Sequence, residues 1–283
     1  MITNNNFSVL PWYKSVDQQN HKKFYAYGNI YKLLAPLDKL LPFQIMRTKT
    51  GVSVSTTWSV IIYDQDDNAV TANIISSFIQ AGLYVKTSEY FDCDVIVFPG
   101  TASLNLGLAS GIYYLKISDG TYTWYSDLIT LTDVSKCVKV EWWDDVDFIM
   151  DNGAIAYDGS FKNTVYLDTD IGKPKYGYEE EGDTRDGLFF AEKQLSEKVY
   201  TFVFIAPEYL CDATRLIRLS DHVTVTNLIG SYSCDSFTAE VEWQEQGDLA
   251  VVFVEFKCGT IAKKIAPGFN DYNIDYNEAY TNE

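Results

Sequence analysis

Short runs of alternating apolar and polar residues, separated by turn residues, recur along most of the chain, and this pattern predicts β-strands. The clearest run spans residues 111–132 and is interrupted by Asp119-Gly120. Asp-Gly supplies the positive φ angles of a two-residue type I′ turn, so this run predicts a β-hairpin. With the turn centred on that dipeptide, Leu115 faces Trp124 across the strands on a buried face.

Turn signals every eight to twelve residues extend the same pattern over residues 43–135 and predict an Ig-like β-sandwich. The Cys, Trp, Cys spacing of antibody domains is missing, so the likeness is one of architecture. The strands are expected at residues 43–47, 52–63, 74–79, 82–87 and 94–99, followed by the hairpin.

Residues 136–265 predict a second β-sandwich-like domain that contains one short helix. Pro207 and Glu208 carry the helix signal, because proline fits the first turn and a carboxylate suits the positive end of the helix dipole. The strands are expected at residues 138–143, 164–168, 188–195, 198–205, 222–227, 238–244 and 249–257, with a hairpin turn at 246–248.

Two flanking segments complete the predicted all-β fold. Residues 1–42 form an N-terminal packing segment whose apolar part, 24–41, either packs across the first domain or inserts into a neighbouring molecule. Residues 266–283 form an acidic C-terminal arm rich in Tyr and Asn, which is too polar to form a core alone. Both ends are expected to lie against other subunits, with packing against their own chain as the alternative.

Composition narrows the classes of function. The 283 residues are enough for two cores, and the formal net charge of −17 disfavours a protein that grips nucleic acid phosphates. An acidic wall past which DNA slides remains open, as does acidity that only confers solubility. No secretory signal or membrane span is expected. The 5 cysteines are too irregularly spaced for a disulfide framework or a metal knuckle and are expected to be reduced.

No residue is assigned a catalytic, cofactor-binding or metal-binding role. Asp64, Asp66 and Asn68 imitate the start of a calcium loop, but Ala69 replaces the required glycine, so a turn is expected. The carboxylate run over residues 168–186 is expected to be a surface loop. The two histidines are expected to be surface or capping groups. They are His21 and His222.

Several short phrases of the sequence resemble structural proteins of Bacteroidetes-infecting tailed phages, including crAss-like phages. The phrases are YGNIY at 27–31, LLPFQI at 40–45, GIYYL at 111–115, TWYS at 123–126, PEYLCDA at 207–213 and LSDHV at 219–223. The resemblance implies a non-enzymatic virion protein, made in the host bacterial cytoplasm, that forms a ring subunit of the tail or collar or an adaptor for other tail proteins. It implies passive contact with a DNA channel, homo-oligomerisation and no cofactor.

On this view the chain associates with itself through edge strands, the segment 24–41 and the C-terminal arm. One alternative is a carbohydrate-binding module or glycan-reading adhesin, with Trp142, Trp143, Trp243 or Trp58 as a stacking platform. One of the adjacent pair Trp142-Trp143 is expected in the core and the other near a rim. A second alternative is a polysaccharide-cleaving enzyme. Its acids would come from Glu141, Asp144, Asp145 and Asp147.

Overall fold

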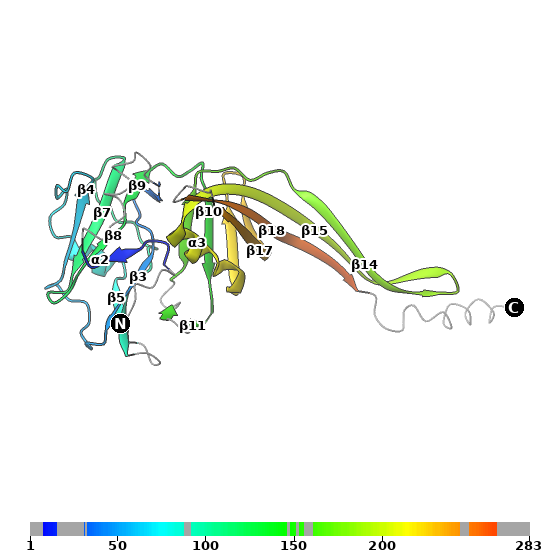
Figure 1. Ribbon diagram of the computed structural model, residues 1–283, viewed down its shortest axis with the longest axis horizontal. Helices are drawn as coiled ribbons and strands as arrows, with labels where there is room; N and C mark the ends of the chain where they lie inside the picture. The colour runs from blue at the N-terminus through cyan, green and yellow to red at the C-terminus, as the bar shows by residue number, and fades with distance from the viewer. Residues whose placement is uncertain are drawn as a thin grey trace.

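The computed structural model describes residues 8–15, 31, 33–87, 92–145, 148–150, 153–155, 161–243 and 249–264. The fold is all-β and sandwich-like, as the sequence pattern predicts. Figure 1 shows a body built from many strands and a curved ribbon of strands β14, β15 and β18 that extends far beyond it.

One 13-stranded sheet contains most strands of the described chain. Its strands follow the order β1-β8-β7-β9-β2-β13-β10-β16-β17-β18-β15-β14, and β4 pairs with β7. Their bounds are β1 Trp12–Tyr13, β2 Leu34–Pro36, β4 Ser59–Asp64, β7 Gly111–Ser118, β8 Thr123–Ser126, β9 Ile129–Thr132, β10 Val138–Trp143, β13 Asn163–Leu167, β14 Lys175–Arg185, β15 Leu188–Pro207, β16 His222–Thr226, β17 Ser231–Trp243 and β18 Leu249–Lys264.

A smaller three-stranded sheet covers the first part of the large one. It consists of β3 Phe43–Thr48, β6 Cys93–Phe98 and β5 Tyr84–Thr87, in the order β3-β6-β5. Aromatic side chains join the two layers, because the ring of Trp12 on β1 lies 4.7 Å from that of Phe43 on β3. Phe43 in turn stacks on Phe98 at 5.2 Å. A further pair, β11 Phe148–Met150 with β12 Gly153–Ile155, stands apart.

The second part of the large sheet curls over its own core. Apolar side chains of β10 and β13 face those of β15 and β18, with Thr214 and Ile217 closing one end. The short helix α3, Glu208–Thr214, supplies that end together with the 3-10 turn η2, Ile217–Leu219. Pro207 caps α3 in an extended conformation and Glu208 lies in its first turn, which confirms the helix predicted from these residues.

The hairpin at residues 111–132 is confirmed, but its register is shifted by two residues. Ile117, not Leu115, lies opposite Trp124. The cause is the side chain of Asp119, which accepts the backbone N–H groups of Thr121 and Tyr122 at 2.8 and 2.7 Å. This moves the positive φ angle to Gly120 alone, at 91°. The faces are unchanged, because a two-residue shift preserves the alternation.

Two predicted strands of the first part are wrong in type or extent. Residues 74–79, predicted as a strand, contain the helix α2, Ile75–Gln80, which buries Ile75 and Phe78 on one side. The strand predicted from residue 52 begins only at Ser59. A turn closed by the bond from Trp58 N to Ser55 O occupies the intervening residues.

The two predicted strands at 188–195 and 198–205 are one continuous strand, β15. The prediction of a surface loop for the carboxylate run is also wrong in large part. Residues 175–185 of the run form β14, and β14 pairs with β15 along the whole length of β14. The hairpin turn predicted at 246–248 lies outside the described residues, as does the segment 266–283.

The described part of the N-terminal segment belongs to the body of its own chain. Leu33, Ala35, Leu40 and Leu41 are buried in the main core, and β2 pairs with both β9 and β13. Most of the apolar side chains of residues 33–41 are therefore covered by their own chain, although Leu37 is exposed, and self-association through the segment 24–41 stays a prediction. The domain boundaries at 42, 135 and 265 stay a prediction, although the large sheet and its core run through both predicted domains.

Candidate functional site

The most distinctive feature of the described chain is the projecting part of β14, β15 and β18, called the arm below. β15 has 20 residues, which at roughly 3.3 Å per residue spans about 66 Å. Its last part, from Phe202, lies over the core, whereas the preceding part pairs with β14 and the end of β18 outside the body (Figure 1).

A tight turn forms the far end of the arm. Arg185 lies opposite Leu188, and Asp186 and Gly187 between them have φ angles of 50° and 80°. These values define a two-residue turn of type I′, whose twist suits a long hairpin. Asp186-Gly187 is the same dipeptide that predicts a hairpin at residues 119–120. The sequence therefore contained a signal for this second hairpin as well.

One face of the arm continues the core face of the sheet. Along β15, alternate residues from Ser196 to Phe204 lie on this face, and Phe202 is buried. Tyr176 and Tyr178 on β14 lie opposite Lys198 and Ser196, so they share the same face.

Ile261 on β18 lies opposite Ser196 and completes the set. The exposed fractions are 72% for Tyr176, 62% for Tyr178 and 70% for Ile261. These three side chains with Lys198 are called the arm face. Its side chains repeat the apolar pattern of the core at a place where the body no longer covers them.

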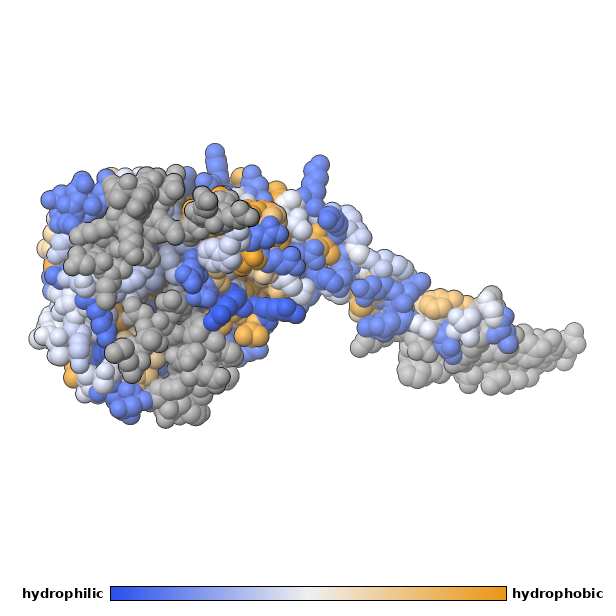
Figure 2. All heavy atoms as spheres, in the orientation of Figure 1, coloured by the Kyte–Doolittle hydropathy of each residue, from blue (hydrophilic) through white to orange (hydrophobic). Residues whose placement is uncertain are grey.

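A second apolar surface lies on the opposite face of the same sheet, nearer the body. Val203 of β15 lies opposite Phe253 of β18, and Ile205 lies opposite Val251. Val203, Ile205 and Phe253 are between 41% and 52% exposed. Together with Val251 they are called the outer patch. Figure 2 shows hydrophobic side chains among strongly hydrophilic ones where the arm leaves the body.

Carboxylates border the outer patch on two strands. Glu240 and Glu242 of β17 lie opposite Phe253 and Val251, and Glu255 of β18 continues the same face. All three are exposed. The patch is therefore an apolar strip with an acidic rim.

Cross-strand pairs of opposite charge hold the other face of the arm in register. Lys257 Nζ lies 2.7 Å from Glu197 Oε2, and Lys193 Nζ lies 3.5 Å from Glu181 Oε2. Pairs near the surface contribute only about 0.2–1 kcal/mol each. Their main effect is to keep this face charged and hydrated, in contrast to the arm face.

β14 is the last strand of the described sheet on its side, and it carries the glutamates of the run 179–181. Glu180 lies on the same face as Tyr178, whose hydroxyl donates to Glu180 Oε1 at 2.6 Å, whereas Glu179 and Glu181 lie on the other face. Charges on an edge strand discourage indiscriminate pairing with other strands. The carboxylate run thus has a structural position that the loop prediction missed, and the cue was its proximity to Asp186-Gly187.

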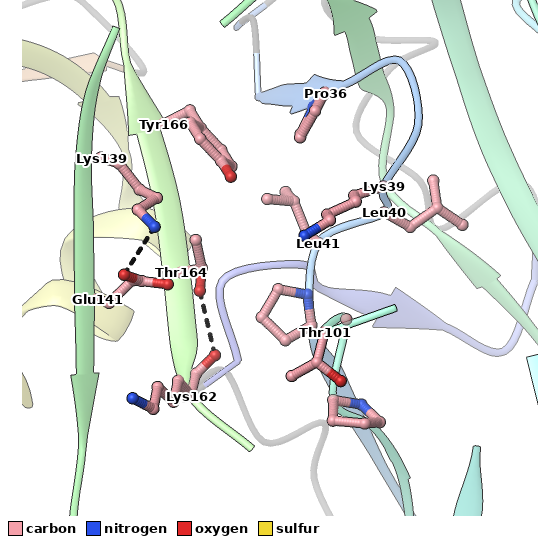
Figure 3. A pocket seen from close by; sticks show the side chains of 13 residues that line it. Pro36, Lys39, Leu40, Leu41, Thr101, Lys139, Glu141, Lys162, Thr164 and Tyr166 are labelled. Carbon is pink, nitrogen blue, oxygen red and sulfur yellow. Dashed lines mark hydrogen bonds and ion pairs between the residues drawn. The ribbon is translucent and has the colours of Figure 1, made fainter. Parts of the chain in front are cut away.

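A cavity of about 270 Å³ lies between the segment after β2 and strands β10 and β13. Figure 3 shows Lys139, Glu141, Lys162 and Tyr166 on one side of it. Lys139 Nζ lies 2.8 Å from Glu141 Oε2. Burial, with a smaller contribution from Glu141, raises the pKa of Tyr166 to about 12. The one carboxylate of the lining is thus already engaged by a lysine.

The acids proposed for polysaccharide cleavage are not brought to one site in the described structure. Glu141 lines the cavity, whereas Asp144 accepts the backbone N–H of Asp221 at 2.7 Å and is absent from the lining. Asp145 Oδ1 lies 2.8 Å from His222 Nε2. His222 is a surface group, as expected. Asp147 and His21 lie outside the described residues.

The tryptophan candidates for sugar stacking occupy three kinds of environment. Trp58 and Trp142 are buried in the core, so one member of the adjacent pair lies in the core, as expected, and it is Trp142. Trp143 has Lys162 Nζ 3.5 Å from its ring centroid and stacks on His222 at 5.0 Å. Trp243, at the end of β17, is 51% exposed. Of these four, Trp243 has the most open ring.

The turn at residues 64–68 is confirmed. Asp64 Oδ1 accepts the backbone N–H groups of Asp66 and Asn68 at 2.9 and 2.8 Å, which closes the loop without an ion. Within the described ranges, no group of three or more His, Cys, Asp or Glu side chains is placed to hold a metal. No helix among those residues is long and apolar enough to cross a membrane.

All five cysteines are free thiols, and Cys93, Cys211 and Cys258 are buried. Burial raises the pKa of Cys211 to about 11 and that of Cys234 to about 12. Because the thiolate is the reactive form, these thiols are poor nucleophiles near neutral pH. Their role in the described structure is that of small core side chains.

Comparison with known proteins assigns no family to the chain. No protein-family model matches it, and no curated protein is found as a relative. What the chain does is therefore inferred from its own residues and surfaces.

Proposed function

We propose that this chain is a non-enzymatic structural component of a phage virion, a ring subunit of the tail or collar or an adaptor on which other tail proteins sit. The observation that carries the proposal is the arm face, where the apolar pattern of the core continues onto a projecting ribbon. Exposed aromatic and aliphatic side chains on a projecting element are typical of surfaces that other proteins cover. The sequence phrases that resemble phage structural proteins support an assembly in the virion.

The net charge of −17 supports the same role. An acidic wall repels the DNA backbone, so a subunit that surrounds a channel would let DNA pass without holding it. Contact with DNA on this proposal is passive, and the partners are copies of the chain and other virion proteins.

Native mass spectrometry and negative-stain imaging of the purified full-length chain test the proposal, first alone and then mixed with tail and neck proteins of the same phage. The expected result is a closed oligomer or a defined complex with a tail protein. A chain that remains monomeric and binds none of these proteins would refute it.

A glycan-binding role is the second candidate, and the exposure of Trp243 is the observation that favours it. The matched variants are Trp243→Ala and Trp143→Ala, because the ring of Trp143 already contacts Lys162 and His222. On a glycan array, this role predicts binding that Trp243→Ala abolishes and Trp143→Ala preserves. An array on which the full-length chain binds no glycan would exclude it.

A further inference from the structure

The arm face and the outer patch lie on opposite faces of one continuous sheet. Tyr178 shares its face with Ser196 of β15, whereas Val203 and Ile205 of the same strand point to the other side. Neither surface can therefore cover the other within one chain. Both surfaces become covered when the arm face of one copy packs on the outer patch of the next copy.

From this geometry we infer that the arm face of one copy packs against the outer patch of a second copy, head to tail. The inference rests on the proposed assembly role and names the partner and the two surfaces. A sheet face on a sheet face packs at a spacing of about 10 Å. The part of β15 that precedes Phe202 has a length of roughly 46 Å at about 3.3 Å per residue, which is enough to reach across to a neighbour.

Charge favours a second copy as the occupant. Lys198 is an exposed cation on the arm face, and the outer patch has an acidic rim of Glu240, Glu242 and Glu255. The carboxylate of Glu180, next to Tyr178 on the same face, is engaged by the Tyr178 hydroxyl at 2.6 Å and by Gln194. The exposed parts of Tyr176, Tyr178 and Ile261 amount to roughly 400 Å² if each large side chain offers somewhat over 100 Å². That is about half of the ~800 Å² that each partner buries in a standard interface.

An interface between different surfaces of identical chains has a definite consequence for assembly. Every copy keeps one free arm face and one free outer patch until the chain of contacts closes on itself. A closed set is a ring, and an open set is a filament. Isologous dimers, in which the same surface meets itself, are not expected from these two patches.

Complementary substitutions in the full-length chain test the inference. Tyr178→Asp places a charge on the arm face, and Ile205→Asp places one on the outer patch. Leu37→Asp is the matched control, since Leu37 is a 41% exposed apolar side chain in the turn after β2, on neither surface. Self-association is measured by sedimentation velocity at about 0.15 M salt. At this ionic strength the Debye length is about 8 Å, so the repulsion between the acidic chains is screened.

Each of the two surface variants is expected to weaken self-association roughly tenfold or more, because a charge is buried without a partner. Leu37→Asp is expected to assemble like the original chain. An equimolar mixture of Tyr178→Asp and Ile205→Asp is expected to form a 1:1 heterodimer that grows no further. One intact arm face and one intact outer patch remain in that pair, and they can meet only once.

The failures of this inference and of the proposed function are distinguishable. If the original chain and both variants assemble alike, or if the mixture forms no heterodimer, assembly stands but these surfaces are wrong. If the original chain is monomeric yet binds another tail protein, the head-to-tail contact is likewise wrong. Thermal unfolding of each variant, with Tyr176→Asp and Phe253→Ser as second substitutions, shows whether a loss of association reflects a loss of folding.

Discussion

Replacing Asp119 by Asn, alone and together with Arg47→Met, perturbs the ion pair that ties the β7–β8 hairpin to the smaller sheet. Arg47 Nη1 lies 2.6 Å from Asp119 Oδ2, and Nη2 lies 3.4 Å from Asp94 Oδ2. The side chains of Arg47, Asp94 and Asp119 are at most 4% exposed. The guanidinium also lies 5.2 Å from the ring centroid of Trp58. Water therefore cannot replace the carboxylate if it is removed.

The magnitude follows from this geometry. Two charges about 4 Å apart attract by about 4 kcal/mol at an effective dielectric constant of about 20, and breaking one partner of a buried pair costs about 3–5 kcal/mol. Asp94 remains beside Arg47 after the change and compensates part of its charge. We therefore expect Asp119→Asn to lower the free energy of unfolding by about 2–4 kcal/mol.

Urea unfolding followed by tryptophan fluorescence at pH 7 measures the effect. Arg47→Met alone should also destabilise, because it leaves two carboxylates buried. The double variant should lose less than the two single losses combined, by about 2 kcal/mol. Asp133→Asn is the control, since Asp133 accepts a turn N–H from Ser135 but has no buried cation beside it. If the losses from Asp119→Asn and Arg47→Met add to within about 0.5 kcal/mol, the ion-pair reasoning is refuted.

Two further predictions concern the body. Burial raises the pKa of Asp127 to about 6, so its folded form prefers the proton, and the stability that it contributes is present at low pH and lost as pH rises through about 6. Asp127→Asn should therefore add about 2–3 kcal/mol to the free energy of unfolding at pH 7, and parallel pH profiles of the two chains in urea unfolding would contradict this. Gly100 and Gly107 share a φ of 63°, but a Cβ at Gly100 would lie 2.9 Å from Pro42 N, whereas nothing lies within 4 Å at Gly107. Both Gly→Ala changes should cost roughly 1–2 kcal/mol for the left-handed conformation, and Gly100→Ala should lower the thermal midpoint further. Equal losses would argue against the steric reasoning.

The local pattern was sufficient for the fold class and for α3. Alternation of apolar residues predicted most strands of the body, and Pro207 with Glu208 predicted where the helix begins. It was not sufficient for α2, because the apolar positions at 74, 75, 78 and 79 fit a helical spacing as well as a short strand. Pairing between distant segments, such as the parallel contact of β2 with β9, has no local signal at all.

The two Asp-Gly dipeptides show how side-chain chemistry decides between similar signals. At Asp119 the carboxylate accepts two backbone N–H groups and also meets Arg47, which shifts the turn by one residue. At Asp186 the φ angle is positive, and the dipeptide forms the type I′ turn that this sequence favours. The strand before it was hidden by residues 179–181, because glutamate has a low preference for strands.

The arm's position in the sheet explains why the sequence alone could not reveal the candidate interface. Tyr176 and Tyr178 alternate with polar residues like the side chains of any half-buried strand, and only the fold shows that the body ends before it reaches them. A ribbon of this kind gains little stability from its own contacts. Its most direct source of further stabilisation is an apolar surface outside the chain.

Amide hydrogen exchange along β14 should therefore slow when the protein assembles, while exchange in the buried strand β6 should stay unchanged. Equal protection of β14 in monomer and assembly would mean that the arm face is not part of the contact.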